Sequence, residues 1–300
     1  MALWVHENFQ NSLSMGYKVT DMLFNAQSKF QQISIVETAL MGKMLLLDGM
    51  VMTSERDEFI YHELIAHIPL LAHPCPKTVL IIGGGDGGTL REVLKHPTVE
   101  RAVLCEIDEM VIDACKQFLP TIASTLNSEQ DAARFEIELR DGAAYVYENP
   151  NTFDVIIVDS TDPIGPGERL FTEAFYKNTK AALTESGIMV NQSESPISSP
   201  DECRRINAML HAVFPVVKPY TACVPTYPGS QWTWTFCSNG ILPNNNTGPS
   251  ASQPDRVAPL TPQCRYFNAD IQHAVFALPN YMEALLSPSV DRPLQSCSRN

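Results

Sequence analysis

The stretch Thr78-Val-Leu-Ile-Ile-Gly83-Gly-Gly-Asp-Gly-Gly88 decides the fold. An apolar strand runs directly into a glycine-rich turn, and the helical pattern Thr89-Leu-Arg-Glu-Val-Leu-Lys95 follows. In an α/β sheet, a strand–turn–helix unit of this kind binds a ligand beyond the carboxyl end of the strand, where glycines let the backbone come close to it. The segment therefore predicts a sheet with a binding site at this edge.

Strand and helix patterns alternate after this stretch. Apolar strands are predicted at Thr78–Ile82, Ala102–Glu106, Phe135–Leu139, Asp154–Asp159 and Gly187–Asn191. Helical patterns lie between them, as at Glu109–Lys116, and a longer one covers residues 57–73, before Pro74. Near-continuous apolar strands that alternate with helices are typical of a doubly wound parallel sheet covered on both faces. The sequence therefore predicts an α/β fold.

The first fifty residues show a different pattern. Short segments alternate apolar and polar residues, with Gly42 and Asp48-Gly49 between them as turn signals. We expect a small antiparallel β domain at residues 1–56, a larger α/β domain at 57–288 and a disordered tail at 289–300. Residues 239–262 hold five prolines and four asparagines, a composition that predicts a long surface loop.

Composition limits the kinds of partner that we expect for the protein. The 300-residue chain carries 21 Lys and Arg against 34 Asp and Glu, a formal net charge of −13. A chain this acidic lacks the positive surface with which nucleic-acid binders neutralise phosphates. No apolar run approaches the roughly 20 residues that cross a bilayer, so we expect no membrane partner. The eight cysteines form no Cys-x-x-Cys pair and the N-terminus has no signal pattern, so we expect no metal site and a cytoplasmic location.

Three acidic residues indicate the kind of ligand. A glycine-rich loop alone is weak evidence, because it serves NAD and flavins as well. Asp86 within the loop would repel a pyrophosphate and attract a cation. Glu106 ends the next strand, where carboxylates bind ribose hydroxyls, and Asp141 follows the third strand, in position to accept from an adenine amino group. Together they predict an adenosine with a positive charge, such as an S-adenosyl sulfonium.

The fourth strand ends in a pair of acids. Asp159 and Asp162 lie three residues apart in Val158-Asp-Ser-Thr-Asp-Pro-Ile-Gly-Pro166. One interpretation is a turn in which both carboxylates bind only backbone amides. The other is a site for a diamine, because a simple methyltransferase does not need two such acids.

With these residues in view, the chain resembles the spermidine synthases, which move an aminopropyl group from decarboxylated S-adenosylmethionine to putrescine. The resemblance runs from about Trp4 to Leu286 and rests on Leu47-Asp-Gly49, Glu55-Arg-Asp-Glu-Phe-Ile-Tyr-His-Glu63, Gly83–Gly88, Glu106-Ile-Asp108, Asp141-Gly142, Asp159–Pro166 and Pro225-Thr-Tyr-Pro228. It implies a Rossmann-like sheet of the class I methyltransferase kind, and a homodimer or homotetramer assembled through the N-terminal sheet. It implies no metal and no cofactor besides the co-substrate, decarboxylated S-adenosylmethionine.

The resemblance also implies roles for individual residues. Asp159 would accept the proton. The nucleoside would be held by Gln31, Asp86, Glu106, Asp141 and Gly142, with Pro166 beside the adenosine. The amine side would be lined by Tyr61, His62, Asp159, Asp162 and Tyr227, together with Ser160 and Thr161 of the acidic turn. We expect Asp162, Tyr61 and Tyr227 to anchor one amine, and the crowding of Asp159 with Asp162 to raise the pKa of one of them.

One position departs from the pattern of that family. Where many members have Asp-Gly-x-x-Gln, this chain has Asp48-Gly-Met-Val-Met52. A thioether donates no hydrogen bond, so we expect weaker donor binding with activity retained. Three alternatives stay open: a different acceptor such as spermidine, cadaverine or agmatine, a methyltransferase on the same fold, and an inactive polyamine-binding protein.

Overall fold

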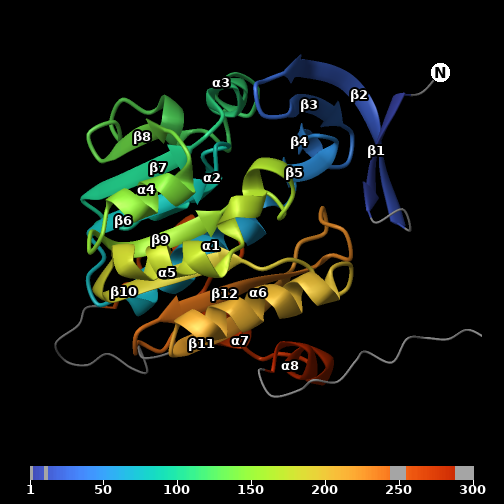
Figure 1. Ribbon diagram of the computed structural model, residues 1–300. Coiled ribbons are helices and arrows are strands. Elements are labelled where there is room, and N and C mark those ends of the chain that lie inside the picture. The colour runs from blue at the N-terminus through green and yellow to red at the C-terminus, as the bar shows by residue number, and fades with distance from the viewer. Residues whose placement is uncertain (1–2, 10–12, 244–254, 288–300) are drawn as a thin grey trace, which may run out of the picture.

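Two sheets organise the molecule (Figure 1). The structure, a computed structural model, describes residues 3–9, 13–243 and 255–287. The first sheet holds five strands in sequence order: β1 (Leu3–Phe9), β2 (Leu13–Gln27), β3 (Gln32–Thr38), β4 (Gly42–Leu47) and β5 (Met50–Ser54). Each strand pairs antiparallel with the next, so the predicted N-terminal antiparallel sheet is confirmed.

The predicted turn at Asp48-Gly49 joins β4 to β5. Leu47 pairs with Met50 across it, and both turn residues have positive φ, 50° at Asp48 and 82° at Gly49. A tight turn of this hand matches the twist of the strands that it connects. It therefore places β5, and the α1 helix after it, beside β4.

The second sheet holds seven strands: β6 (Thr78–Gly83), β7 (Arg101–Glu106), β8 (Phe135–Leu139), β9 (Phe153–Asp159), β10 (Leu183–Gln192), β11 (Val216–Cys223) and β12 (Gln231–Ser238). Their order is β11-β12-β10-β9-β6-β7-β8. The five strands from β10 to β8 are parallel, as predicted, whereas β12 pairs antiparallel with both β10 and β11. The sheet is therefore mixed, because β11 and β12 form a hairpin and not a crossover unit.

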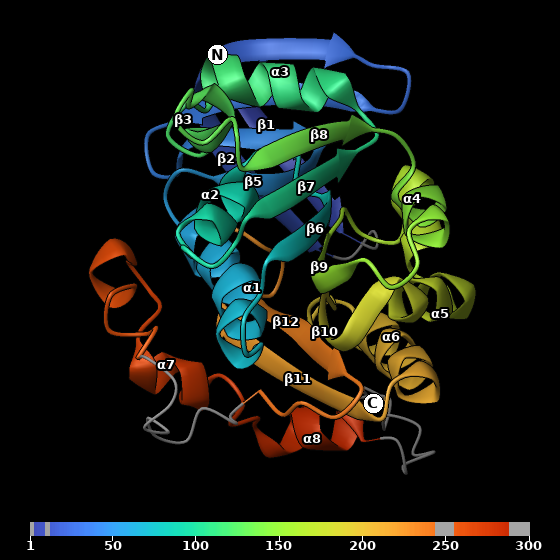
Figure 2. The ribbon, with the colours of Figure 1, turned by 90° about the vertical axis from the view of Figure 1, so that its left-hand side faces the viewer.

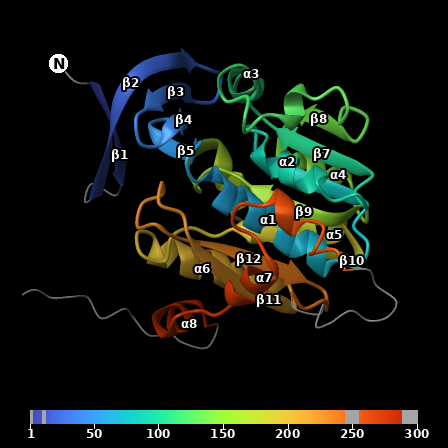
Figure 3. The ribbon, with the colours of Figure 1, turned by 180° about the vertical axis from the view of Figure 1, so that it is seen from behind.

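Helices cover both faces of this larger sheet (Figure 2). They are α1 (Glu58–Ala72), α2 (Gly88–Leu94), α3 (Glu109–Phe118), α4 (Gly142–Glu148), α5 (Glu173–Ala182), α6 (Pro200–Val213), α7 (Ala269–Ala274) and α8 (Asn280–Leu286), with short 3₁₀ turns η1 (Thr125–Asn127), η2 (Gly165–Leu170) and η3 (Thr261–Gln263). Seen from behind, α1 leads from β5 into the larger sheet with α2 beside it (Figure 3). Among the described helices, none is both long and apolar enough to cross a membrane.

Alternate residues of the strands enter two different cores. In β6, Val79 and Ile81 pack with the apolar residues of α1, α2 and α3, whereas Leu80 and Ile82 pack with those of α4, α5 and α6. Both sets are fully buried. A strand buried on both sides has a continuous apolar sequence, which explains why the pattern predicts the central strands so well.

Two strands, β1 and β11, are missed by the sequence pattern. Each lies at an edge of its sheet, where one side has no neighbouring strand. Pro219 interrupts β11 and pairs in register with Thr235, and an edge is the place where a strand tolerates proline. Edge strands need fewer apolar residues, so their sequences carry a weaker signal.

The predicted loop at 239–262 is only partly described, since residues 244–254 lie outside the described residues. The described parts of this segment, up to residue 243 and from residue 255, contain no strand or α-helix, as the prediction of a surface loop requires, and residue 256 anchors the second part. The guanidinium of Arg256 donates to the carbonyls of Leu71, at 2.8 Å, and His73, at 2.7 Å. Both carbonyls lie at the C-terminal end of α1, so Arg256 ties this segment to the end of the helix. The predicted tail, 289–300, lies outside the described residues, and the domain division stays a prediction.

Candidate functional site

The candidate site lies where the order of the parallel strands reverses. β6 pairs with β7 on one side and with β9 on the other, so Gly83 at the end of β6 stands opposite Asp159 at the end of β9. Chain connections run away from this point in both directions, which leaves a crevice between the strand ends. The site thus joins two segments about 75 residues apart in the sequence.

A single cavity at this point gathers all thirteen predicted site residues: Gln31, Tyr61, His62, Asp86, Glu106, Asp141, Gly142, Asp159, Ser160, Thr161, Asp162, Pro166 and Tyr227. Met52, the departure from the family pattern, lines the same cavity. The residues come from strand ends and turns of the larger sheet, from the loop before β3 and from helix α1. The structure thus brings the predicted residues together around one cavity, and their roles stay predictions.

The glycine-rich turn brings the backbone of β6 against that of β9. The amide of Gly84 donates to the carbonyl of Asp159 at 2.8 Å. Gly83 has φ of +81°, and a Cβ there would lie 2.2 Å from the same carbonyl oxygen. Only glycine fits such a conformation and such an approach. The turn thus fixes Asp159 at the floor of the cavity.

Asp159 is held by two hydroxyl groups. Tyr61 donates to its Oδ1 at 2.8 Å, and Thr89, in the first turn of α2, donates to its Oδ2 at 2.6 Å. Burial raises the pKa of this carboxyl, and the negative charge of Asp86 raises it further. The predicted source of that charge, Asp162, is wrong, because the Asp162 carboxyl hydrogen-bonds to Glu194 instead.

Asp86 has the opposite environment. The His62 ring lies between two carboxylates, with Nδ1 2.6 Å from Oε2 of Glu58 and Nε2 3.4 Å from Oδ2 of Asp86. Arg91 lies 2.7 Å from the same Glu58 oxygen. Burial opposes ionisation of Asp86, but His62 and the amide of Gly88 hold the pKa of Asp86 below its usual value. The two carboxylates raise the pKa of His62 well above its usual value despite burial, so the ring is an imidazolium.

His62 was predicted to line the amine side, and the cavity does include it. Its two ring nitrogens are both engaged, however, by Glu58 and Asp86. The ring also packs against Gly88, where a Cβ would lie 2.3 Å from it. The histidine therefore stabilises the charge of Asp86.

The predicted nucleoside residues form the other side of the cavity. Glu106 ends β7, and its Oε1 accepts from the amides of Ile107 and Asp108 at 2.8 and 2.9 Å. Burial raises the pKa of Glu106 to about 7. Gln31 donates to Asp108 at 3.1 Å. The second oxygen of Glu106, Oε2, faces the glycine-rich turn. It would lie 2.9 Å from a Cβ at Gly85 if that residue had one.

Asp141 both caps a helix and lines the cavity. Its Oδ1 caps α4 by accepting from the amides of Ala143, at 2.8 Å, and Ala144, at 3.3 Å, while Arg169 reaches Oδ2 at 3.2 Å. Its residue also lines the cavity together with Gly142. A carboxylate has about four acceptor positions, so capping leaves room for a ligand donor.

Three acids at the predicted amine side of the cavity share one environment. Glu7 of β1, Asp162 and Glu194 are buried or nearly so, and burial raises the pKa of each. For Glu7 the pKa is about 7. Its Oε2 is buried without a hydrogen-bond partner in the described structure, although the residue lines the cavity. This end of the cavity is therefore rich in acidic side chains.

The loop of Tyr227 is tied down at its base. Asp57, which precedes α1, accepts from the amide of Thr226 at 2.8 Å and from its hydroxyl at 2.5 Å. The Tyr227 hydroxyl donates to the carbonyl of Met52 at 2.7 Å, and its ring lies edge-on to Tyr61 with centroids 5.8 Å apart. Tyr61, Tyr227 and Asp162 line the same cavity, and their predicted anchoring of one amine stays a prediction; Tyr61 itself donates to Asp159.

Some residues at the site were not expected from the sequence: Glu7, Asp57, Thr89, Gln192 and Glu194. Glu7 lies in a strand that the pattern missed, and Thr89 reads as an ordinary first-turn residue of a helix. The sequence could have drawn attention to Asp57, because an acid directly before a helical pattern is a typical N-cap residue. Gln192 ends strand β10 and Glu194 follows it, and polar residues are common at both kinds of position.

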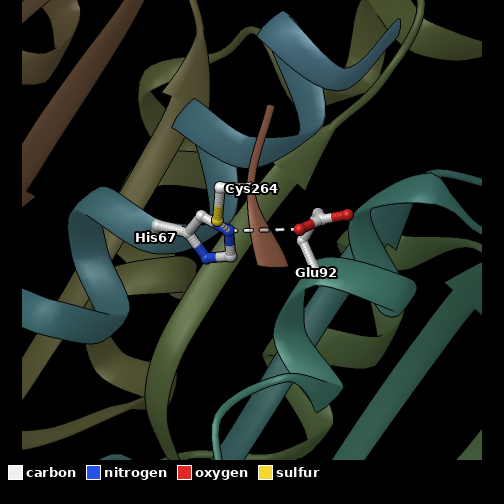
Figure 4. A group of neighbouring side chains, drawn as sticks. All are labelled: His67, Glu92 and Cys264. Carbon is white, nitrogen blue, oxygen red and sulfur yellow. Dashed lines mark hydrogen bonds and ion pairs between the residues drawn. The ribbon is translucent and has the colours of Figure 1, made fainter. Parts of the chain in front are cut away.

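In the described residues, one group of three side chains could offer atoms to a metal: His67, Glu92 and Cys264 (Figure 4). The Nε2 of His67 lies 3.1 Å from Glu92 and 3.4 Å from the Cys264 sulfur. Glu92 already pairs with Arg91 at 2.8 Å and Lys95 at 2.6 Å. Burial raises the pKa of the Cys264 thiol to about 12, while a metal needs the thiolate. We interpret the group as a buried ion-pair cluster that joins α1 and α2 to the C-terminal segment.

Comparison with known proteins agrees with this geometry. Residues 58–247 match the spermine/spermidine synthase domain, and residues 3–55 match the spermidine synthase tetramerisation domain. The polyamine aminopropyltransferase of Clostridium tetani is 43% identical over 290 residues, which cover 97% of this chain and 99% of that protein. The chain belongs to the spermine/spermidine synthase family. The polyamine aminopropyltransferase of Thermoanaerobacter pseudethanolicus is 44% identical over 283 residues, 94% of this chain and 98% of that protein.

Solved structures of the family share the fold. A spermidine synthase in complex with the transition-state analogue AdoDATO matches with a TM-score of 0.89 and 41% identity, over 95% of this chain and 94% of that one. The spermidine synthase of Thermotoga maritima matches with a TM-score of 0.86 and 39% identity over the same shares. An N-terminal antiparallel sheet followed by a Rossmann-like sheet is therefore confirmed as the fold.

Proposed function

We propose that the protein is a polyamine aminopropyltransferase that uses decarboxylated S-adenosylmethionine as donor, putrescine as acceptor and Asp159 as base. In this reaction the acceptor nitrogen forms a bond to the aminopropyl carbon while the carbon–sulfur bond breaks. The sulfonium becomes the neutral thioether of methylthioadenosine, and the proton of the nitrogen passes to Asp159. The products are spermidine and methylthioadenosine.

The environment of Asp159 is the observation that carries the proposal. An alkyl ammonium with a pKa near 10.4 is almost wholly protonated at pH 7, so a base assists the attack. A carboxyl of ordinary pKa matches that proton poorly. Burial and the charge of Asp86 raise the pKa of Asp159, and the same burial would lower that of the amine. Tyr61 and Thr89 each donate one hydrogen bond to the carboxylate, which leaves further acceptor positions for the proton.

The donor would lie along the strand ends of β6, β7 and β8. We propose that Gln31, Glu106, Asp141, Gly142 and Pro166 hold the adenosine and that Asp86 faces its cationic part. Asp86 suits that role because His62 keeps it ionised. Ordinary S-adenosylmethionine carries a carboxylate that would face Asp86 and Asp159. At an effective dielectric near 20, like charges about 4 Å apart repel by roughly 4 kcal/mol, which favours the decarboxylated donor.

The acceptor would occupy the acidic end of the cavity. Asp162 and Glu7 line it there, with Tyr227 and Trp232 as the aromatic wall, their ring centroids 4.5 Å apart. A diamine fits this arrangement because its far ammonium meets acids while its carbon chain meets rings. An equally acidic end would also accept cadaverine or agmatine, since one or two methylenes change binding by only about 1–3 kcal/mol.

We also propose that the chain forms a homotetramer through its N-terminal sheet. Support comes from the match of residues 3–55 to a tetramerisation domain and from exposed apolar side chains on β1 and β2. Leu3, Trp4 and Leu13 are 51%, 49% and 41% exposed. A cytoplasmic location and a reaction without metal stay predictions.

A product assay by mass spectrometry tests the proposed reaction. The protein is incubated with decarboxylated S-adenosylmethionine and an equal mixture of putrescine, cadaverine, agmatine and spermidine. A parallel tube contains ordinary S-adenosylmethionine in place of the decarboxylated donor. We expect spermidine and methylthioadenosine in the first tube alone.

Other products would identify the alternatives. A different aminopropylated amine would correct the acceptor and keep the reaction class. A methylated product with S-adenosylhomocysteine in the second tube would show a methyltransferase. Binding of both substrates without any product would show an inactive polyamine-binding protein.

A further inference from the structure

Glu194 is a buried acid that the proposed reaction does not use. It follows β10 and is 2% exposed, although it does not line the cavity itself. Its φ is +69°, a left-handed conformation that a non-glycine residue adopts only where the surrounding structure enforces it. Two hydrogen bonds from Thr233 hold the backbone here. Thr233 of β12 donates from its amide to the Glu194 carbonyl at 3.0 Å and from its hydroxyl at 2.7 Å.

The strained backbone directs the Glu194 side chain toward the acidic turn. Its carboxyl hydrogen-bonds to the carboxyl of Asp162, which does line the cavity. Gln192 adds a bond from its Nε2 to Oε1 of Glu194 at 3.4 Å, and its own Oε1 accepts from the Glu194 amide at 3.1 Å. Two carboxyl groups form a hydrogen bond only if one of them carries a proton.

We place the shared proton on Glu194. Burial, the charge of Asp162 and the bond to Asp162 raise the pKa of Glu194 well above its usual value, whereas burial raises the pKa of Asp162 and the bond to Glu194 opposes that rise. The other ionisable groups nearby are Glu202, which adds negative charge, Arg205, which pairs with Glu202, and the thiol of Cys203. The pair as a whole therefore carries one negative charge, on Asp162.

We propose that Glu194 is a positioning residue for the acceptor: its carboxyl donates a hydrogen bond to Asp162 and fixes the carboxylate that receives the ammonium of the acceptor. The inference rests on the proposed function, because it assigns the far amine to Asp162. A lone carboxylate at the end of a turn rotates, whereas one that accepts a hydrogen bond from a rigid strand end presents its free oxygen in one direction. Glu194 thus acts through Asp162 and touches no substrate.

Two substitutions separate the hydrogen bond from the packing. Glu194→Gln keeps a neutral donor of nearly the same shape, and Glu194→Leu keeps the volume but donates nothing. We expect Glu194→Leu to raise the acceptor KM about tenfold or more, the size of a lost hydrogen bond to a charged group, with the donor KM unchanged. Glu194→Gln should stay within about threefold of the wild type. Glu185→Gln, at an exposed position of the same strand, is the matched control.

Binding measured without turnover keeps this test separate from the proposed reaction. Putrescine is titrated calorimetrically into the full-length protein saturated with methylthioadenosine, for the wild type and each variant. Weaker binding in Glu194→Leu alone supports the positioning role even if the favoured product is another amine. Equal binding in all variants overturns it, and so does a Glu194→Gln variant as weak as Glu194→Leu. A loss that affects donor and acceptor alike would show a merely structural residue.

Discussion

The two carboxyl groups at the carboxyl ends of β6 and β9 belong to one cavity but have opposite electrostatics. Asp86 faces an imidazolium, His62, which Glu58 supports from the other side. Asp159 faces two neutral hydroxyls and the negative charge of Asp86. The pKa of Asp86 is therefore held low, and that of Asp159 is raised.

This difference divides the cavity into a charged side and a protonatable side. A carboxylate that stays ionised suits a cationic donor, and a carboxyl that resists ionisation suits the capture of a proton. Asp162, Glu194 and Glu7 are also of the second type, since the pKa values of all three are raised. Under the proposed function, donor binding would depend on the acid that has a cation beside it, and proton transfer on an acid that has none.

Removal of the base should have the largest effect. Asp159→Asn should lower kcat by about 10²- to 10⁴-fold, because it keeps the shape but accepts no proton. The same variant should be at least as stable as the wild type at pH 8, since it removes a buried charge. Single-turnover kinetics and urea unfolding measure the two effects. Unchanged turnover would remove Asp159 from its proposed role.

Substitution of His62, on the charged side of the cavity, should lower stability, whereas Asp159→Asn should not. His62→Gln leaves Asp86 buried without its cation, so we expect a loss of about 3 kcal/mol in the free energy of unfolding at pH 7. His62 has a raised pKa, so its contribution is complete below pH 6.5 and disappears as pH rises through the folded value. Urea unfolding measures the loss.

Two further variants check that loss. His273→Gln, at an exposed position of α7, should change nothing. The double variant His62→Gln with Asp86→Asn should recover most of the stability. If the double variant is no more stable than His62→Gln alone, the pairing with Asp86 is not what the histidine provides.

The raised pKa of Glu7 predicts a pH effect. Its pKa is about 7 in the folded protein against 4.5 for an unperturbed carboxyl, so folding retains a proton that the unfolded chain releases. The contribution to stability is present at low pH and is lost as pH rises toward 7. Glu7→Gln should therefore match the wild type near pH 4.5 and exceed it by about 3 kcal/mol at pH 8, since each unit of the pKa shift is worth about 1.4 kcal/mol. Unfolding midpoints of the wild type and the variant at the two pH values test this expectation. The same difference in stability at both pH values would refute the raised pKa of Glu7.

The smallest effect is expected at Met52, which belongs to neither set of acids. Met52→Gln supplies the amide that many family members have, and should lower the donor KM by a factor equivalent to one hydrogen bond, about 1 kcal/mol. The pH dependence of kcat should not change, because no ionisable group is altered. The hydrogen bond from the Tyr227 hydroxyl should persist in this variant, since its acceptor is the backbone carbonyl of Met52, which the substitution does not change. A higher donor KM would show that the thioether already contributes to binding.

Local patterns were enough to predict most of the fold. The central strands are apolar throughout because both faces are covered, and the glycine-rich turn marks the end of β6. Asp86, Glu106, Asp141 and Asp159 follow those strands, so the edge on which they gather could be predicted. The edge strands β1 and β11 were missed, since exposed edges relax the apolar pattern.

The contacts of the acids could not be predicted in the same way. Glu7 lies in one of the missed strands, and Glu194 follows a strand without any local sign of its contact with Asp162. Asp162 was expected to raise the pKa of Asp159, but its partner proved to be Glu194. Spacing in the sequence shows which acids share an edge, and it does not show which way their side chains turn.

The sequence by itself determined the order of strands and helices, the turn at Gly83 and the edge on which the acids gather, because these depend on neighbouring residues along the chain. Only the tertiary structure decided which acids are charged. His62 comes from α1, Glu7 from the N-terminal sheet and Glu194 from the end of β10. Electrostatic energy depends on separations of a few ångströms in space, and folding sets these between segments that are distant in the sequence.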